Sequence, residues 1–104
     1  MTADEFREIA LSFPGTEERS HMNHPDFRVG GKIFATLSND LTKGMAQLGP
    51  EKQGEYMLLD PSFHPASGAW GRKGSTMITL TTANTDVVRA ALADAWELRS
   101  KKEK

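Results

Sequence analysis

The chain has 104 residues, 38% of them hydrophobic and 26% charged, a composition typical of one globular domain, residues 1–104, and not of a disordered segment. Its 13 basic and 14 acidic side chains give a formal net charge of −1, so any attraction to nucleic acid has to come from a local patch. The lack of cysteine excludes disulfides, thiolate catalysis and cysteine-ligated metals. No run approaches the about 20 apolar residues of a membrane span, and the acidic N-terminus is unlike a signal peptide. We therefore expect a soluble, cytoplasmic protein with no membrane partner.

The first predicted element is a helix that begins after Thr2. Thr2 and Glu5 have the spacing of a capping box, in which each side chain hydrogen-bonds the backbone of the other residue. Apolar residues recur at helical spacing as far as Phe13, and Pro14-Gly15 ends the element. The polar residues 16–22 predict an edge strand at best.

A β-hairpin is predicted around Gly30-Gly31, because apolar and polar side chains alternate on both sides of the two glycines. A two-residue turn would place Phe34 on the same face as Phe27. A three-residue turn through Lys32, with a glycine bulge, gives one continuous apolar face and is favoured for that reason. The predicted inward set is then Phe27, Val29, Ile33, Ala35 and Leu37. The predicted outward set is Arg28, Lys32 and Phe34.

The second half of the chain alternates strands and helices. A short strand is predicted at residues 44–48, a helix from Pro50 to Leu59, and a long loop over residues 62–74. The β-branched residues 75–82 predict a strand with either Met77 or Ile78 and Leu80 facing inward, and a last helix is capped by Thr85. This order predicts an α+β fold, an antiparallel sheet of about four to five strands with helices at both termini packed on one face.

Three segments of the chain resemble the MmcQ/YjbR-like proteins: HPDFRVGGKIFATL, GAWGRKGSTMITL and ALADAWE. The opening FREIALSFPGTEERSH is similar to their N-terminal helix and following strand, so the resemblance covers nearly the whole chain. It implies a frataxin-like (CyaY-like) fold with two protruding β-loops, described as a double wing, and it implies DNA binding. Relatives carry an aromatic residue after the second glycine of WGRKG, where this chain has Ser75.

Two basic loops are the candidate nucleic-acid site. Cations on glycine-flanked loops can approach phosphates, and an aromatic ring beside them can stack on a base. The predicted site consists of Arg28, Lys32, Trp70, Arg72 and Lys73. Two other interpretations remain open. Arg72 and Lys73 form a solvated turn over a buried Trp70, or Trp70 and Phe34 form an apolar contact surface for a protein or a small ligand.

Catalytic and metal-binding patterns are weak in this chain. His21, His24 and Asp26 lie close in sequence, but the odd separation of the two histidines places them on opposite faces of an extended strand, and His64 is distant. A cluster of acids lies near the N-terminus. Acids in the first turn of a helix are stabilised by its positive N-terminal end, so the cluster does not require a metal ion to explain it. Its members are Asp4, Glu5, Glu8, Glu17 and Glu18. We therefore expect a non-enzymatic binding protein with no metal and no cofactor.

Overall fold

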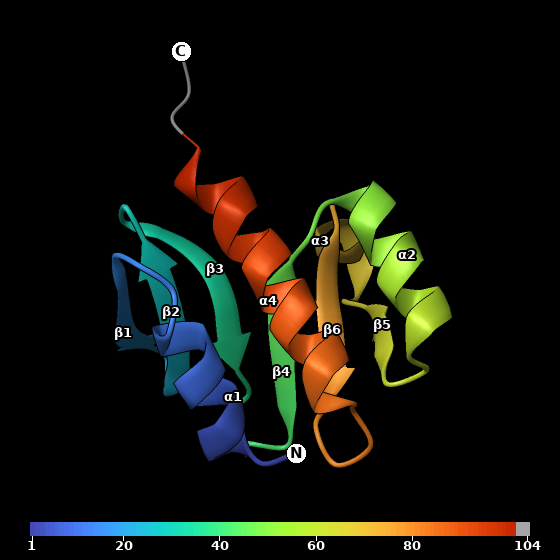
Figure 1. Cartoon of the computed structure of the whole chain (residues 1–104), viewed down its shortest axis with the longest axis horizontal. Helices are drawn as coiled ribbons and strands as arrows, with labels where there is room; N and C mark the ends of the chain where they lie inside the picture. The colour runs from blue at the N-terminus through green and yellow to red at the C-terminus, as the bar shows by residue number, and fades with distance from the viewer. Residues whose placement is uncertain (102–104) are drawn as a thin grey trace.

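The computed structural model describes residues 1–101, which form an α+β fold with a six-stranded antiparallel sheet (Figure 1). The strands are β1 (Thr16–His21), β2 (His24–Val29), β3 (Lys32–Leu37), β4 (Lys43–Gln47), β5 (Phe63–Pro65) and β6 (Ser75–Thr79). The helices are α1 (Ala3–Leu11), α2 (Pro50–Leu59), α3 (Gly68–Arg72) and α4 (Thr85–Ser100). The strand order is β1-β2-β3-β4-β6-β5. None of the described helices is long and apolar enough to cross a membrane.

The helices α1, α2 and α4 lie on one face of the sheet, with α4 running across its centre (Figure 1). The core fills the space between this face and the helices, and its largest fully buried side chains include Phe6, Phe27, Phe34, Leu37 and Leu92. The alternate side chains of the strands point to the opposite face, which we call the open face.

The ends of the helices follow the capping chemistry of the sequence. The predicted capping box at α1 is confirmed, since the Glu5 amide donates to Thr2 Oγ1 at 3.1 Å and the Thr2 amide donates to Glu5 Oε1 at 2.9 Å. At α4 the cap is Asn84 and not the predicted Thr85. The Asn84 side-chain oxygen accepts from the amides of Asp86 and Val87, and it can do so because Asn84 remains extended outside the helix.

The predicted three-residue turn between β2 and β3 is wrong, because the turn has two residues. Gly30 and Gly31 take φ values of 57° and 80°, which suit the twist of a tight hairpin. The extra residue lies further along β3, where Phe34 is inserted between the pairs Arg28–Ile33 and Phe27–Ala35. This bulge turns Phe34 into the core, where it is fully buried, and leaves Ile33 on the open face.

The predicted loop over residues 62–74 contains two short elements that local sequence does not indicate. The three-residue β5 pairs with β6, and Phe63 stacks on Tyr56 of α2 with ring centroids 5.7 Å apart. The short α3 is tied to α2, because the Gln53 side-chain amide donates to the Gly71 carbonyl oxygen at 3.0 Å. Both elements depend on tertiary contacts, since segments this short and rich in Gly, Ser and Pro do not form structure alone.

The strand count exceeds the prediction of four to five because β5 lies within the predicted loop, whereas the edge strand predicted at best over residues 16–22 is present as β1. In β1 no residue is buried, so the strand lacks the alternation of buried and exposed positions that identifies a strand in sequence. At the other edge, β5 is only three residues long. The sequence left open whether Met77 or the pair Ile78 and Leu80 faces inward. In the structure Ile78 and Leu80 are buried in the core.

Candidate nucleic-acid interface

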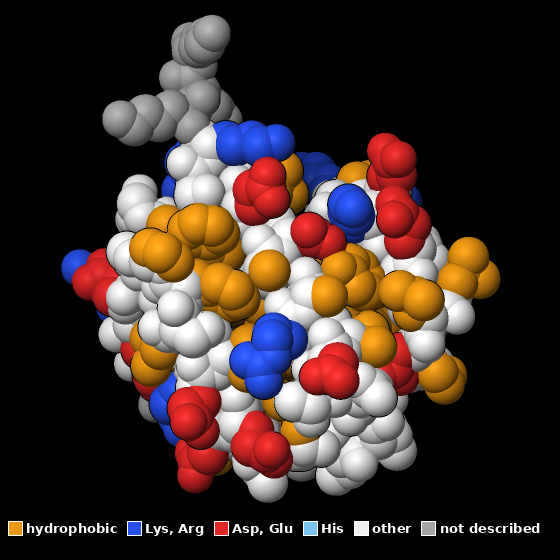
Figure 2. Space-filling model, in the orientation of Figure 1, with side chains coloured by type: hydrophobic (Ala, Val, Ile, Leu, Met, Phe, Trp, Pro, Cys, Tyr) orange, Lys and Arg blue, Asp and Glu red, His pale blue; other side chains and the backbone are white. Residues whose placement is uncertain are grey.

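A hollow of about 400 Å³ brings together basic side chains from three separate segments. We call it the basic hollow, and its lining consists of Lys32, Gln47, Gly49, Lys73, Leu98, Arg99 and Lys101. Lys32 begins β3 directly after the tight turn, Lys73 follows α3, and the other two cations lie at the end of α4. In Figure 2, basic side chains are visible beside this end of α4. No Asp or Glu of residues 1–101 is part of the lining, so the hollow is lined by positive charge alone.

Backbone packing brings Lys73 to the hollow. Gly74, the next residue, has a φ of 104° and lies against the backbone of Gly49, so closely that a Cβ atom there would collide with it. The Gly74 carbonyl oxygen also accepts from the Leu48 amide at 3.1 Å. The junction between α3 and β6 is therefore held directly against the junction between β4 and α2. This contact places Lys73 and Gly49 in one lining.

The four cations of the basic hollow are not engaged in ion pairs within the described chain. None of its four cations forms an ion pair with a carboxylate among residues 1–101. The Nε atom of Arg99 is buried and has no hydrogen-bond acceptor among those residues. Cations are favourable at the C-terminal end of a helix, which explains why two of them are tolerated at α4. A buried N–H group without an acceptor is nevertheless costly, and an anion in the hollow would supply one.

A second cavity, of about 720 Å³, lies on the open face beside the basic hollow. We call it the Trp70 groove, and it is lined by His21, His24, Ile33, Thr36, Met45, Gln47, Ala66, Ser67, Trp70 and Ser75. Trp70 itself is 69% exposed. Gln47 lines both cavities, so the groove and the hollow adjoin at this side chain. Within the described chain this lining also contains no carboxylate.

A buried carboxylate organises the outer wall of the groove. Asp26 is fully buried on β2 and accepts from Arg28 Nε at 2.8 Å, from Arg28 Nη2 at 3.1 Å and from His21 Nδ1 at 2.7 Å. Hydrogen bonding to Arg28, and then to His21, lowers the pKa of Asp26 despite its burial. Asp26 is therefore ionised and only accepts, which places the proton of His21 on Nδ1. Arg28 is therefore paired with Asp26 and is not a free cation for a ligand.

The structure brings together some of the predicted site residues and separates others. Lys32 and Lys73 share the basic hollow, and Trp70 lines the adjoining groove. Arg72 is exposed but lines neither cavity, and Arg28 is bound to Asp26. Sequence reasoning missed Arg99, Lys101 and Gln47. The basic end of the last helix was visible in the sequence, but only tertiary packing places it beside Lys32.

The residues considered for metal binding do not converge. The expectation that His21 and His24 lie on opposite faces of one strand is wrong, because they end β1 and begin β2, pair with each other and line the same groove with ring centroids 6.2 Å apart. His64 lies on β5, opposite Met77. Among residues 1–101 no group of three His, Cys, Asp or Glu side chains is arranged to hold a metal ion. In the acidic cluster, Asp4 and Glu18 both pair with Arg7, and Glu17 pairs with Arg19.

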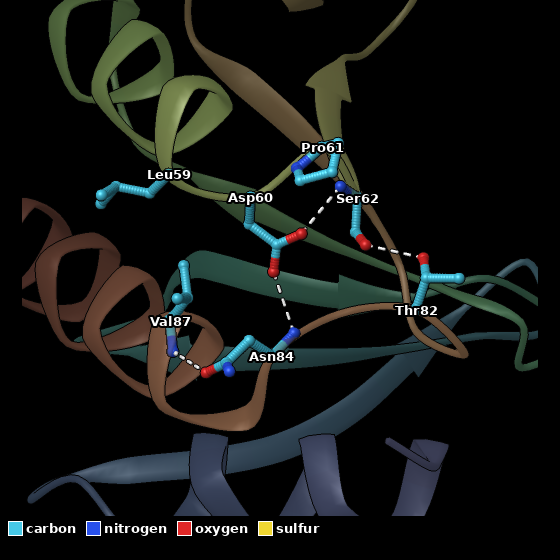
Figure 3. A pocket seen from close by; sticks show the side chains of 7 residues that line it. All are labelled: Leu59, Asp60, Pro61, Ser62, Thr82, Asn84 and Val87. Carbon is cyan, nitrogen blue, oxygen red and sulfur yellow. Dashed lines mark hydrogen bonds between the residues drawn. The ribbon is translucent and has the colours of Figure 1, made fainter.

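A third cavity, of about 490 Å³, lies at the other end of α2 and has its polar groups already paired (Figure 3). Asp60 accepts from the amides of Ser62 and Asn84, both at 2.9 Å, and the hydroxyls of Ser62 and Thr82 lie 2.6 Å apart. These bonds join the start of α4 to the chain that follows α2. The cavity is therefore a structural junction, and we do not include it in the candidate site.

Comparison with known proteins gives a family and a fold. The chain matches no curated protein. A solved structure, that of the Deinococcus radiodurans protein DR2400 with its DUF419 domain, is similar with a TM-score of 0.79. The two sequences are 20% identical, and the match covers 97% of this chain and 80% of that one, so the likeness shows the fold alone. The YjbR family model matches residues 11–98. The chain therefore belongs to the YjbR family.

Proposed function

We propose that this protein binds nucleic acid, with the basic hollow neutralising backbone phosphates. The observation that carries the proposal is the gathering of Lys32, Lys73, Arg99 and Lys101 in one lining without a carboxylate among the described residues. Such a local patch supplies the attraction that a net charge of −1 does not. The resemblance to double-wing proteins of frataxin-like fold points to the same function. The proposed role is binding and not catalysis.

The alternative, a module for a protein or a small ligand, has less support. It required Trp70 and Phe34 to be exposed on one concave face. Trp70 is exposed, but Phe34 is fully buried, in edge contact with Phe13 in the core. The apolar contact surface thereby loses its second aromatic ring, and Trp70 shares the groove with Ile33 and Met45 and with polar side chains. That arrangement suits a stacking platform beside phosphate sites better than a protein-docking patch.

The test is the salt dependence of binding to fluorescently labelled duplex DNA, measured by anisotropy. If four phosphates are neutralised, log affinity falls against log salt concentration with a slope of about −3.6. The double variant Lys32→Gln/Lys73→Gln removes two of the four cations of the hollow. We expect it to make the slope shallower by about two units, since each lost phosphate contact removes about one.

A matched control removes the same charge elsewhere. Lys43 begins β4, whereas Gln47 of the hollow ends it, and Arg89 is exposed on the first half of α4. The double variant Lys43→Gln/Arg89→Gln keeps the wild-type slope if the hollow is the phosphate site. If both double variants reduce the salt slope equally, the binding reflects general charge attraction. Binding that does not respond to salt would contradict the proposal.

A further inference from the structure

We infer that the nucleic acid held here is single-stranded, with one unpaired base stacked on Trp70 inside the Trp70 groove. This inference rests on the proposed function and adds to it the form of the ligand. It is drawn from the exposure of Trp70, from the chemistry of the groove and from Gln47, which lines both the groove and the basic hollow.

The contrast between the two tryptophans of the chain supports a binding role for Trp70. Trp96 stacks on Phe13 with ring centroids 5.8 Å apart, and its Nε1 donates to the Pro14 carbonyl oxygen at 3.0 Å. Trp70 is 69% exposed and lines a cavity. A large aromatic side chain gains most from burial, so leaving it exposed loses stability that a ligand would restore.

The backbone under Trp70 is rigidly placed. Gly71 packs against the Ala66 carbonyl oxygen so closely that no Cβ atom fits between them. The buried side-chain amide of Gln53 donates to the carbonyl oxygens of Gly71 and Ser75, at 3.0 and 3.1 Å. The indole is therefore carried by a fixed turn and not by a mobile loop. A fixed aromatic platform loses little conformational entropy when a base stacks on it.

The rest of the groove suits the edge of a nucleobase. Ile33 and Met45 contribute apolar surface, while Gln47 and Ser75 contribute polar groups. The Ser75 hydroxyl donates to Gln47 Oε1 at 2.9 Å, which orients the amide and leaves its nitrogen as a donor. Bases present acceptors along their edges and an apolar face for stacking. A volume of about 720 Å³ lies within the range of small-ligand pockets.

The position of Gln47 decides between a single strand and a duplex. Gln47 lines both cavities, so a phosphate in the basic hollow and a base in the groove lie next to one another across this side chain. In a duplex each base is stacked and paired, and it has to be turned out before it can enter a pocket, at a cost in free energy. An unpaired strand presents its bases freely, so it can occupy hollow and groove together.

The experiment uses the full chain with Trp96→Phe, in which Trp70 is the remaining tryptophan. Fluorescence is recorded during titration with a (dT)12 strand and with a 12-base-pair duplex. We expect quenching by the single strand, tighter binding of that strand than of the duplex, and no quenching by the duplex. Trp70→Ala lowers single-strand affinity about 5- to 100-fold, while Trp70→Phe, which keeps a ring, loses less.

The salt slope separates this inference from the proposed function. Trp70→Ala keeps the wild-type slope on (dT)12, whereas Lys32→Gln/Lys73→Gln makes it shallower by about one and a half units. A strand of abasic sites should bind with the same slope but without quenching. Equal, salt-sensitive binding of duplex and single strand with unchanged Trp70 fluorescence would overturn the inference and leave the proposed function standing. No salt-sensitive binding of either would overturn both. Quenching by a U12 strand would support the inference, since uracil and thymine share the chemistry of stacking on an indole.

Discussion

At the scale of single residues, Asp26 decides what the open face offers to a ligand. It fixes His21 as one wall of the Trp70 groove and holds Arg28 by two hydrogen bonds. Asp26 and Arg28 are two apart on a strand and therefore share a face, so their pairing follows from the sequence once β2 is recognised. Reading Arg28 as a free cation overlooked that consequence. Arg28 does not line the groove, and it contributes by hydrogen-bonding the carboxylate that holds His21.

The pH dependence of stability tests this role of Asp26. Its pKa is lower in the folded protein than in the unfolded chain, so folding favours the ionised form. The resulting stabilisation is fully present above the unfolded pKa of about 3.9 and is lost as the pH falls through the lower pKa of the folded state. Asp26→Asn removes the titration. We expect it to lower the free energy of unfolding by about 1–3 kcal/mol at pH 7.

Urea denaturation at pH 7 and near pH 3 measures both effects. Because the variant lacks the proton uptake, its stability should fall less than that of the wild type between the two pH values, and the two proteins should become more similar in acid. Stability curves that run parallel over the whole pH range would show that Asp26 contributes no favourable charge interaction.

At the scale of secondary-structure elements, the sequence predicted what depends on local pattern and missed what depends on neighbours. The capping box of α1 and the bounds of α2 were predicted because caps, proline and apolar spacing are local signals. The bulge at Phe34 and the turn α3 were missed because packing against Phe13 and Gln53 stabilises them. The candidate site divides in the same way. Its loop residues were predicted, but the end of α4 was not.

The contact of Gly74 with Gly49 provides a prediction about how the α3–β6 junction is held. Gly74→Ala should destabilise the protein strongly, because the new methyl group would collide with the Gly49 backbone and force the two junctions apart. Gly30→Ala is the matched control. Gly30 also has a positive φ, of 57°, but has open space around it, so it carries only the cost of the left-handed conformation, about 1–2 kcal/mol.

Thermal unfolding of the two glycine variants gives the comparison. We expect a loss for Gly74→Ala at least twice that for Gly30→Ala, together with weaker phosphate binding, since Lys73 is displaced with its neighbour. Similar losses in both variants would mean that the two junctions can separate without cost.

At the scale of the whole molecule, acidic and basic side chains are interspersed, and Figure 2 shows acidic side chains near the C-terminal end of α4 as well as further from it. The basic hollow lies at the C-terminal end of α4, whereas Asp4 and Glu5 lie in the first turn of α1, toward the other end of the molecule (Figure 1). The molecule extends over 33 × 28 × 26 Å, and charges in 0.1 M salt are screened over about 10 Å. A nucleic acid at the hollow is therefore influenced by nearby carboxylates and scarcely by distant ones.

Two exposed helical glutamates test this distance dependence with the same substitution. Glu97 lines a small cavity together with Lys101, one of the cations of the basic hollow, while Glu8 lies on α1. Since one unit charge at about 9 Å in water contributes roughly 0.5 kcal/mol, Glu97→Gln should raise DNA affinity about twofold at low salt, and less at 0.15 M. Glu8→Gln should leave the affinity unchanged at 0.15 M. Equal gains from the two variants would mean that net charge governs binding, and the basic hollow would then have no special part in it.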